Sequence, residues 1–553
     1  MHRRAGLKRA RRWGDDCGIL PRVTETPRPQ PPSALRIVTP RYGADVVGGA
    51  ERLVRALAES LVAVGWRVEV FTSCAVDAAT WADALPSGVS VEDGVVVRRF
   101  AVRAPRRPEL FRQVSRGFFR LPSVARPERV WVDLQGPWVP GLLDALRLAT
   151  PMPALFAPYL YYPTLVGLPA YVGPRVLLPA AHDELPLRLR AVARALRAAD
   201  GLLFGTVEER EIVVSRHPFV EAMPFAVGNV GVVAPADVDG LRFRASVGLG
   251  PDEPYLLYGG RVAEGKGMAE LLGGVSQLRA QGRRVRLVLT GEAGVVTPAS
   301  DAVLPVGRLD EAARWDALAG AAAVVVPSFH ESLSLLALEA CAVGRPVLGN
   351  GASPVLAGQV ARSGGGIAYR GAGELASAAA RVLGDVGLAA ALGESGRAWV
   401  ASTYRWEGVH ERVRGLIARA VVAAEARGWV GADWSGAAGG VPRSGGRGTE
   451  VGPDGTPRTL PERPHSKNQP TNPSGAAARG GDVGAARPGA SPSAGGGDTS
   501  PGAPTSSASR EEPKGAAAQT GDGGATSPGA SRSGDGGTLG NPAAPPRADG
   551  NDA

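Results

Sequence analysis

The sequence VVVPSFHESLSLLALEACAVGRPVL, Val324–Leu348, predicts a strand, a helix and a second strand in close succession. Val324–Val326 is a short β-branched run, which is typical of a buried strand. We expect a helix from Ser332 to Val343 and a second strand after Gly344. A helix N-terminus carries free N–H groups and the positive end of the helix dipole, so this one suits a phosphate.

Two glutamates frame the predicted helix, Glu331 at its beginning and Glu339 inside it. Eight residues of helix correspond to about 12 Å along the axis and a net rotation of about 80°, so one extended polar ligand can contact both carboxylates. The alternative is that both are solvated surface charges. Against it, Glu339 lies in the apolar run LSLLALEACAV, where a carboxylate needs a partner.

The two ends of the 553-residue chain differ in composition from residues 34–427. Residues 1–33 hold eight Arg and Lys against three Asp and Glu and then become Pro-rich, whereas residues 428–553 are dominated by Gly, Ala, Ser and Pro. Such segments bury too little apolar surface to offset their chain entropy, so we expect a disordered basic arm and a disordered tail. A basic arm can contact nucleic acid or anionic lipid. The favoured interpretation is a solubilising tail or a start codon assigned too far upstream, and no nucleic acid is expected as a partner.

Targeting signals and membrane spans are not evident in the sequence pattern. The positive N-terminus has no apolar run behind it, and no stretch is long and apolar enough to span a bilayer. Cys17, Cys74 and Cys341 are too far apart for a disulfide framework or a zinc site. We therefore expect a cytoplasmic protein, with peripheral contact to the inner face of the membrane left open.

Strand and helix patterns alternate in two successive blocks along residues 34–427, which predicts an α/β protein. We expect two Rossmann-like, doubly wound domains that face each other across a cleft, over residues 34–235 and 251–402, with a linker over 236–250. The pattern around Asp93 and Gly94 predicts a hairpin turn. Asp237-Val238-Asp239 matches a metal-binding D-x-D literally, but it lies in the linker and is interpreted as a turn.

Two glycines, Gly48 and Gly49, stand between the predicted strand Leu35–Thr39 and a predicted helix. Glycines at such a turn let the backbone approach a ligand at the carboxyl end of a strand. A tight turn without a ligand is an equally good interpretation of these two residues alone.

A polar triplet, His182-Asp183-Glu184, ends a predicted buried strand that begins at Val176. In open α/β sheets the carboxyl ends of strands line the crevice where ligands bind, so the triplet points there. A loop histidine without a function is the alternative.

Arg261 and Lys266 flank a glycine-containing loop between a predicted strand and a predicted helix. The guanidinium and the ammonium suit a diphosphate, the first as a planar fork and the second as a point charge. Glu331 and Glu339 can accept hydrogen bonds from the vicinal hydroxyls of sugar rings. Two cations for a diphosphate and two carboxylates for sugar hydroxyls together indicate a nucleotide sugar.

With these residues in this order, the chain resembles a glycosyltransferase of the GT-B fold, similar to the retaining enzymes of glycosyltransferase family 4. The resemblance covers nearly all of Leu35–Trp406 and depends on the Gly48-Gly49-Ala50-Glu51 loop, Ala181-His182-Asp183, Arg261 with Lys266, and Glu331 with Glu339. It implies that the final segment, residues 403–427, is a helix that crosses back to the first domain.

The resemblance also implies roles for single residues around the donor. Arg261 and Lys266 would neutralise the diphosphate as the leaving group departs. Glu331 would bind the transferred sugar and Glu339 the ribose hydroxyls, while N–H groups of Leu333–Leu335 would cradle the distal phosphate. No protein nucleophile is evident, and neither a metal nor another cofactor is expected.

Further contacts are implied on both sides of the cleft. Gly48 and Gly49 would approach donor and acceptor, and His182 would line the reaction centre, with Asp183 beside it as a substrate contact. Ser332 and Ser334 stand where the family often has glycines; they keep the backbone donors but crowd the sugar pocket, which leaves the donor sugar open.

A basic segment, residues 103–129, holds eight arginines interleaved with Phe111, Phe118 and Phe119. It is compatible with a membrane surface or an anionic acceptor, although a solvated helix with a few core aromatics is the favoured alternative. The predicted function is transfer of a hexosyl unit from a UDP- or GDP-linked sugar to a glycan, a lipid-linked or a small-molecule hydroxyl acceptor. A sugar-nucleotide epimerase or hydrolase and a non-catalytic carbohydrate-binding protein are the rival interpretations.

Overall fold

The computed structural model describes residues 33–262, 265–291, 300–430, 450–451 and 457–458. The described residues up to 430 belong to one compact unit. In a second unit, the two-residue strands β15 (Glu450–Val451) and β16 (Pro457–Arg458) pair antiparallel. The predictions of disorder for residues 1–33 and 428–553 therefore fall almost wholly outside the described residues.

The first sheet has eight strands in the order β3-β4-β2-β1-β5-β6-β7-β8, and only the β3–β4 pair is antiparallel. Helices connect the parallel strands, so both faces are covered, and Leu35, Ile37 and Val38 of β1 are fully buried. The strands are β1 (Ala34–Val38), β2 (Arg67–Ser73), β3 (Gly88–Glu92), β4 (Val95–Phe100), β5 (Ala154–Phe156), β6 (Arg175–Leu177), β7 (Gly201–Phe204) and β8 (Phe225–Val227). The helices are α1 (Gly49–Ala63), α2 (Pro108–Arg120), α3 (Glu128–Gln135), α4 (Pro140–Leu148), α5 (Tyr162–Ala170), α6 (Arg190–Ala198) and α7 (Val207–Arg216).

The hairpin prediction is confirmed by β3 and β4. Asp93 and Gly94, the two residues between them, have φ angles of 49° and 79°. Two consecutive left-handed residues make the turn that matches the twist of paired strands, which is why Asp-Gly is favoured there.

The second sheet has six strands, all parallel, in the order β11-β10-β9-β12-β13-β14. Its strands are β9 (Tyr255–Gly259), β10 (Arg286–Thr290), β11 (Val303–Gly307), β12 (Ala323–Val326), β13 (Val347–Asn350) and β14 (Gly366–Tyr369). Its helices are α8 (Gly240–Ser246), α9 (Met268–Ala280), α10 (Glu311–Gly320), α11 (Leu335–Ala342), α12 (Pro354–Ser363), α13 (Gly371–Gly384) and α14 (Val386–Thr403). The predicted α/β architecture with two doubly wound sheets is confirmed.

The strand order of the second sheet reverses between β9 and β12, its two central strands. Ligands of open α/β sheets bind at such a switch point, outside the carboxyl ends of the strands. The loop after β9 carries Arg261 and Lys266, and the loop after β12 carries Glu331. The fold therefore brings the two predicted diphosphate cations and the predicted sugar carboxylate to one edge of one sheet.

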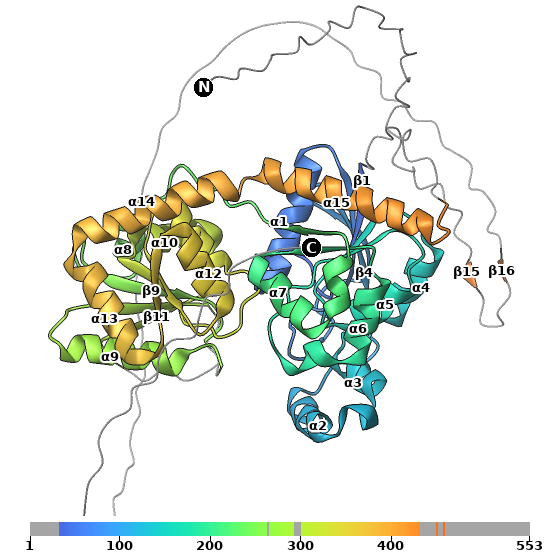
Figure 1. Cartoon of the computed structure of the whole chain (residues 1–553), viewed down its shortest axis with the longest axis horizontal. Coiled ribbons are helices and arrows are strands. Elements are labelled where there is room, and N and C mark those ends of the chain that lie inside the picture. Colours follow the sequence, from blue (N-terminus) through green and yellow to red (C-terminus); the bar gives the residue numbers. More distant parts are fainter. Residues whose placement is uncertain (1–32, 263–264, 292–299, 431–449, 452–456, 459–553) are drawn as a thin grey trace, which may run out of the picture. The chain divides into compact units, whose positions relative to one another are not determined.

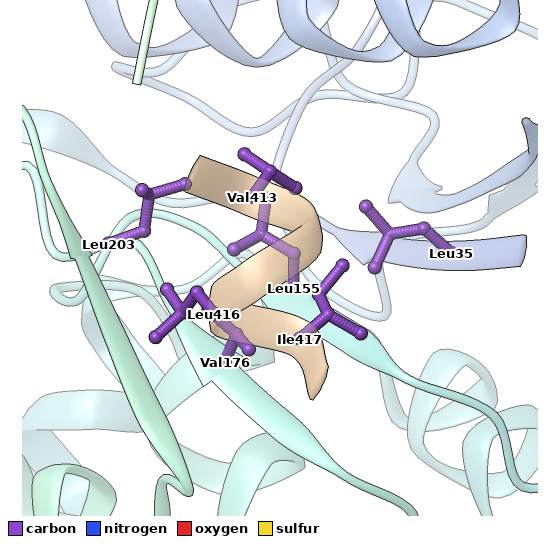
Figure 2. Close-up of a pocket in the computed structure, with 7 residues that line it drawn as sticks. All are labelled: Leu35, Leu155, Val176, Leu203, Val413, Leu416 and Ile417. Carbon is purple, nitrogen blue, oxygen red and sulfur yellow. The ribbon is translucent and has the colours of Figure 1, made fainter. Parts of the chain in front are cut away.

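The last helix, α15 (Trp406–Ala426), packs against β6, β7 and β8 of the first sheet (Figure 1). Its side chains Val413, Leu416 and Ile417 help to line a small pocket beneath it (Figure 2), whose other lining residues are Leu35, Leu155, Val176 and Leu203. Every lining side chain is aliphatic, so this pocket offers a nucleotide sugar no polar partner. The packing itself returns α15 to the first sheet.

The aromatic residues of the basic segment pack into the protein rather than onto its surface. The rings of Phe118 and Phe119 lie 5.6 Å and 5.5 Å from that of Trp131 on α3. Arg106 is likewise held locally, because its Nε donates to the carbonyl of Ala79 at 2.9 Å. These contacts favour the alternative of core aromatics beneath a solvated helix, and membrane contact stays a prediction, as does a cytoplasmic location. Among the described residues no single helix is long and apolar enough to cross a membrane; α13 and α14 meet that test only as a pair, bent by 101°.

Candidate active site

The helix of the organising stretch begins later than its sequence indicates. Ser334 is the N-cap residue of α11, because its Oγ accepts a hydrogen bond from the N–H of Ala337 at 3.3 Å. The predicted start at Ser332 is therefore wrong, and the side chain of Ser334 is the reason. Glu331 lies in a loop ahead of the helix, so the expected 80° rotation between it and Glu339 does not apply.

The start of α11 keeps backbone donors that a phosphate can use. The N–H of Ser334 donates to Gln359 Oε1 at 3.2 Å and is thereby satisfied. For the N–H groups of Leu333 and Leu335 the described part of the chain contains no acceptor. One of the three N–H groups predicted to bind a phosphate is thus already used within the protein. Phosphate binding by the other two stays a prediction.

Lys266 and Glu331 face each other across the two strand-end loops. Lys266 Nζ lies 3.9 Å from Glu331 Oε1. Burial raises the pKa of Glu331, while Lys266 and a hydrogen bond from Ser328 oppose that rise. The adjacent Gly267 has a φ of 73°, and a Cβ there would lie 2.0 Å from the carbonyl oxygen of Pro327. Only glycine lets the loop after β9 pack this closely on the loop after β12.

Arg261 lies at the beginning of the loop after β9. Its carbonyl accepts a hydrogen bond from the hydroxyl of Tyr258 at 2.8 Å, which fixes the backbone, while its side chain is exposed. Within the described residues the Arg261 guanidinium makes no hydrogen bond or ion pair. It is therefore available to an anionic ligand at the switch point.

His182 lies in the loop after β6, five residues beyond the end of that strand. The predicted strand reaching His182 is thus too long, since β6 ends at Leu177. His182 Nδ1 has no hydrogen-bond partner among the described residues and lies 3.5 Å from Glu184 Oε1. Glu184 in turn accepts a hydrogen bond from the Tyr159 hydroxyl at 2.5 Å.

A second histidine, His330, lies beside the first. The two ring centroids are 5.4 Å apart. Burial, together with His330 and Lys266, lowers the pKa of His182 to about 4, so the imidazole is neutral at neutral pH. A neutral imidazole has one N–H donor and one acceptor nitrogen, and of the two nitrogens Nδ1 is buried beside Glu184. Sequence reasoning missed His330, although its position directly before Glu331 was a usable signal.

Asp183 lies in surface ion pairs. Its carboxylate is 2.6 Å from Arg216 Nη2 and 3.7 Å from Arg188 Nη2, and the hydrogen bond from Arg216 lowers its pKa. Nothing in this geometry favours a substrate contact for Asp183, which stays a prediction.

Glu339 has the partners that its apolar surroundings required. The side chain is buried, and its two carboxylate oxygens accept hydrogen bonds from Arg52 and Arg314. Arg52 comes from α1 beside the first sheet, and Arg314 comes from α10 beside the second. The predicted ribose carboxylate is therefore already engaged by two guanidinium groups.

The two glycines before α1 serve different purposes. A Cβ on Gly48 would lie 2.0 Å from Glu51 Oε2, so Gly48 makes room for a buried ion pair between Glu51 and Arg41, whose Nη2 is 2.5 Å from Glu51 Oε1. A Cβ on Gly49 would meet nothing within 4 Å. Gly49 is exposed, and its predicted approach to donor and acceptor stays a prediction.

A hydrogen bond joins the elements of the two sheets close to Glu331. The hydroxyl of Thr206, at the start of α7, donates to the carbonyl of Ser332 at 3.0 Å. Ser332 thus contributes a contact between the two sheets' loops through its backbone, while its predicted contact with the substrate is untested.

The chain is similar in sequence to known glycosyltransferases. Residues 253–385, which contain the switch point, match the family described as glycosyl transferases group 1. The chain is 27% identical over 383 residues to D-inositol 3-phosphate glycosyltransferase 2 of Catenulispora acidiphila, covering 62% of this chain and 83% of that protein. It is 28% identical over 341 residues to D-inositol 3-phosphate glycosyltransferase of Frankia alni, covering 55% of this chain and 78% of that protein.

Solved structures share the fold. Sucrose-phosphate synthase from Thermosynechococcus elongatus superposes with a TM-score of 0.51 at 22% identity, over 71% of this chain and 99% of that one. HepE of Anabaena in complex with UDP-glucose gives a TM-score of 0.53 at 15% identity, over 69% of this chain and 99% of that one. The family match, the curated relatives and the shared fold together identify the chain as a glycosyltransferase of the GT-B fold.

Proposed function

We propose that the chain is a retaining enzyme that transfers a hexosyl unit from a UDP- or GDP-linked sugar to a hydroxyl acceptor. The observation that carries the proposal is the pairing of Lys266 with Glu331 at the switch point, with His182 packed on the neighbouring His330 and with Arg261 exposed in the loop after β9. Cations, a carboxylate and a neutral imidazole are the groups that a diphosphate-linked sugar needs around it.

The donor diphosphate binds between Arg261, Lys266 and the first turn of α11. The positive charges stabilise the nucleoside diphosphate as the bond from its phosphate oxygen to the sugar C1 breaks. Glu331 accepts hydrogen bonds from sugar hydroxyls, and Glu339 accepts them from the ribose. The acceptor oxygen then bonds to C1 on the face that the leaving group vacates, and its proton passes to the departing phosphate oxygen.

His182 positions the sugar rather than supplying a proton. With a pKa of about 4 its imidazole is uncharged at neutral pH, so it offers one N–H donor and one acceptor nitrogen to the reacting ring. No protein nucleophile and no metal take part in the proposed reaction. Transfer should therefore persist after dialysis against EDTA.

The acceptor is proposed to be a small polyol or sugar. The curated relatives are named for D-inositol 3-phosphate, and sucrose-phosphate synthase is named for a phosphorylated sugar product. The acceptor's hydroxyl group is proposed to approach the donor past Gly49, where a Cβ would meet nothing within 4 Å.

A panel of UDP-, GDP- and ADP-sugars tests the proposal. The purified protein is screened by thermal shift for donor binding, then for nucleotide release with and without D-inositol 3-phosphate, inositol and glucose 6-phosphate. We expect a UDP- or GDP-sugar to bind and release nucleotide only with an acceptor. Release without an acceptor would instead indicate a hydrolase or epimerase, binding without any release a carbohydrate-binding protein, and absence of binding would refute the proposal.

A further inference from the structure

Glu209 is a fully buried carboxylate near the proposed reaction centre that takes no part in the proposed chemistry. It lies in the first turn of α7. Its Oε1 accepts a hydrogen bond from the N–H of Ala181 at 2.8 Å, and its Oε2 accepts one from the N–H of Gly205 at 2.6 Å. A buried carboxylate is costly unless its oxygens are satisfied, so these two loops are tied to it.

The loop on the Oε1 side is strained. Ala180 has a φ of 49°, a left-handed conformation that is unfavourable for a residue with a Cβ. Strain of this kind persists only where neighbouring contacts enforce it. The hydrogen bond from Ala181 to Glu209 is such a contact, and the next residue is His182.

The other side of the helix start reaches the loop that carries Glu331. Thr206 caps α7: its hydroxyl accepts a hydrogen bond from the N–H of Glu209 at 3.1 Å and donates one to the carbonyl of Ser332 at 3.0 Å. A Cβ on Gly205 would come within 3.0 Å of Leu333 Cβ, so the two segments are in close packing. One turn of helix therefore touches the loops on both sides of the proposed reaction centre.

Helix capping alone does not account for this arrangement. In a capping box the glutamate three residues after the cap returns to the backbone N–H of the cap residue. In addition to the Thr206 N–H, the carboxylate of Glu209 reaches the N–H of Gly205 and, in a separate loop, the N–H of Ala181. Nor does a cap require complete burial of the carboxylate.

We propose that Glu209 is a positioning residue that sets His182 against Glu331 across the proposed reaction centre. It acts through the backbone of Ala181 on one side and through Thr206 and Ser332 on the other. The inference rests on the proposed function, because it assumes that His182 and Glu331 contact the same sugar.

Glu209→Gln is the sharpest perturbation. The side chain keeps its shape, but one acceptor oxygen becomes an NH₂ donor that faces a backbone N–H donor, so one of the two loops loses its hydrogen bond. We expect kcat to fall on the order of 10- to 100-fold, as for a small misplacement of reacting groups, while the donor KM changes less than twofold. Glu211→Gln, which makes the same substitution at an exposed position of α7, is the matched control and should leave kcat unchanged.

An NMR measurement tests the positioning without any transfer activity. The protein is labelled with ¹³C-histidine, and the His182 signal is assigned by its loss in His182→Asn. We expect Glu209→Gln to shift this signal and Glu211→Gln to leave it in place. Because this readout needs no donor or acceptor, it separates failure of the inference from failure of the proposed function.

Two outcomes would overturn the inference: an unshifted His182 signal in Glu209→Gln, or an unchanged kcat in an enzyme whose activity has been established. Should Glu209→Gln not fold, Thr206→Val takes its place, since it removes the hydroxyl's bonds to Ser332 and to the N–H of Glu209 and keeps the carboxylate. That variant should lower kcat at least fivefold at an unchanged donor KM, and wild-type kcat in it would equally refute the proposed role.

Discussion

The two arginines on Glu339 make a quantitative prediction about donor binding. If ribose hydroxyls bind this carboxylate, one guanidinium must give way. The side chain of Arg52 is 45% exposed, whereas that of Arg314 is 21% exposed, so Arg52 is the group that can leave at the lower cost. We therefore expect Arg52→Ala to tighten donor binding.

The size of the effect follows from the exposure of the Arg52 ion pair. The guanidinium of this pair is half-exposed although the carboxylate is buried. Scaled as for an exposed pair, the interaction contributes roughly 0.2–1 kcal/mol, and removing that competition corresponds to a Kd that is lower by about 1.4- to 5-fold. Salt screens an exposed pair, so the difference between wild type and variant should shrink as ionic strength rises. Isothermal titration with the nucleotide sugar found in the donor screen, at two salt concentrations, measures both quantities.

Arg55→Ala is the matched control for this prediction. Arg55 lies on the same helix but pairs with Glu59 and Asp93, so its loss should leave the donor Kd unchanged. Weaker donor binding by Arg52→Ala would refute the reasoning, because Arg52 would then be a ligand of the donor and not its competitor.

Three further predictions concern the same edge of the second sheet and the histidine opposite it. Lys266→Ala and Glu339→Ala should each raise the donor Kd at least tenfold with an unchanged circular dichroism spectrum, and wild-type affinity in either would remove that residue from the donor site. The ¹³C signal of His182 should titrate near pH 4 and not near 6.5. Because the unfolded chain takes up this proton first, the histidine makes the folded state less stable as pH falls from 6.5 to 4. A titration midpoint near pH 6.5 would contradict the buried, cation-flanked site. Gly267→Ala should lower the melting temperature more than Gly265→Ala, because both carry a positive φ but only the first meets the Pro327 carbonyl; equal effects would show that the close packing of the two loops is not required.

Most of the fold could be predicted from local sequence patterns. The hairpin at Asp93 and Gly94 and the alternation of strands and helices depend on neighbours in sequence, so their signals are legible without a structure. The beginning of α11 was misplaced because Ser334, and not an earlier residue, captures the first-turn N–H. Ser332 and Ser334 are both suitable N-cap residues, and the sequence alone does not show which of them caps the helix.

Only part of the candidate site could be predicted from the sequence. Arg261, Lys266 and Glu331 follow strands whose ends the switch point brings together, so their types and positions indicated a shared ligand. The pairing of Glu339 with Arg52 could not be predicted, because Arg52 is 287 residues away in the sequence and lies on a helix beside the other sheet. Glu209 could also be predicted only in part. The spacing Thr206-x-x-Glu209 indicates a capping box, but the hydrogen bond from Ala181 depends on how two loops meet.

The stereochemistry of transfer tests the central claim most directly. The protein is incubated with the α-linked nucleotide sugar that binds it and with the acceptor that triggers nucleotide release, and the anomeric proton of the product is followed by ¹H NMR from the first minutes. We predict an α-linked product, because the proposed mechanism has departure and attack on the same face of C1, between Lys266, Glu331 and His182. A β-linked product would contradict the proposed site, since inversion requires a general base on the opposite face of the sugar.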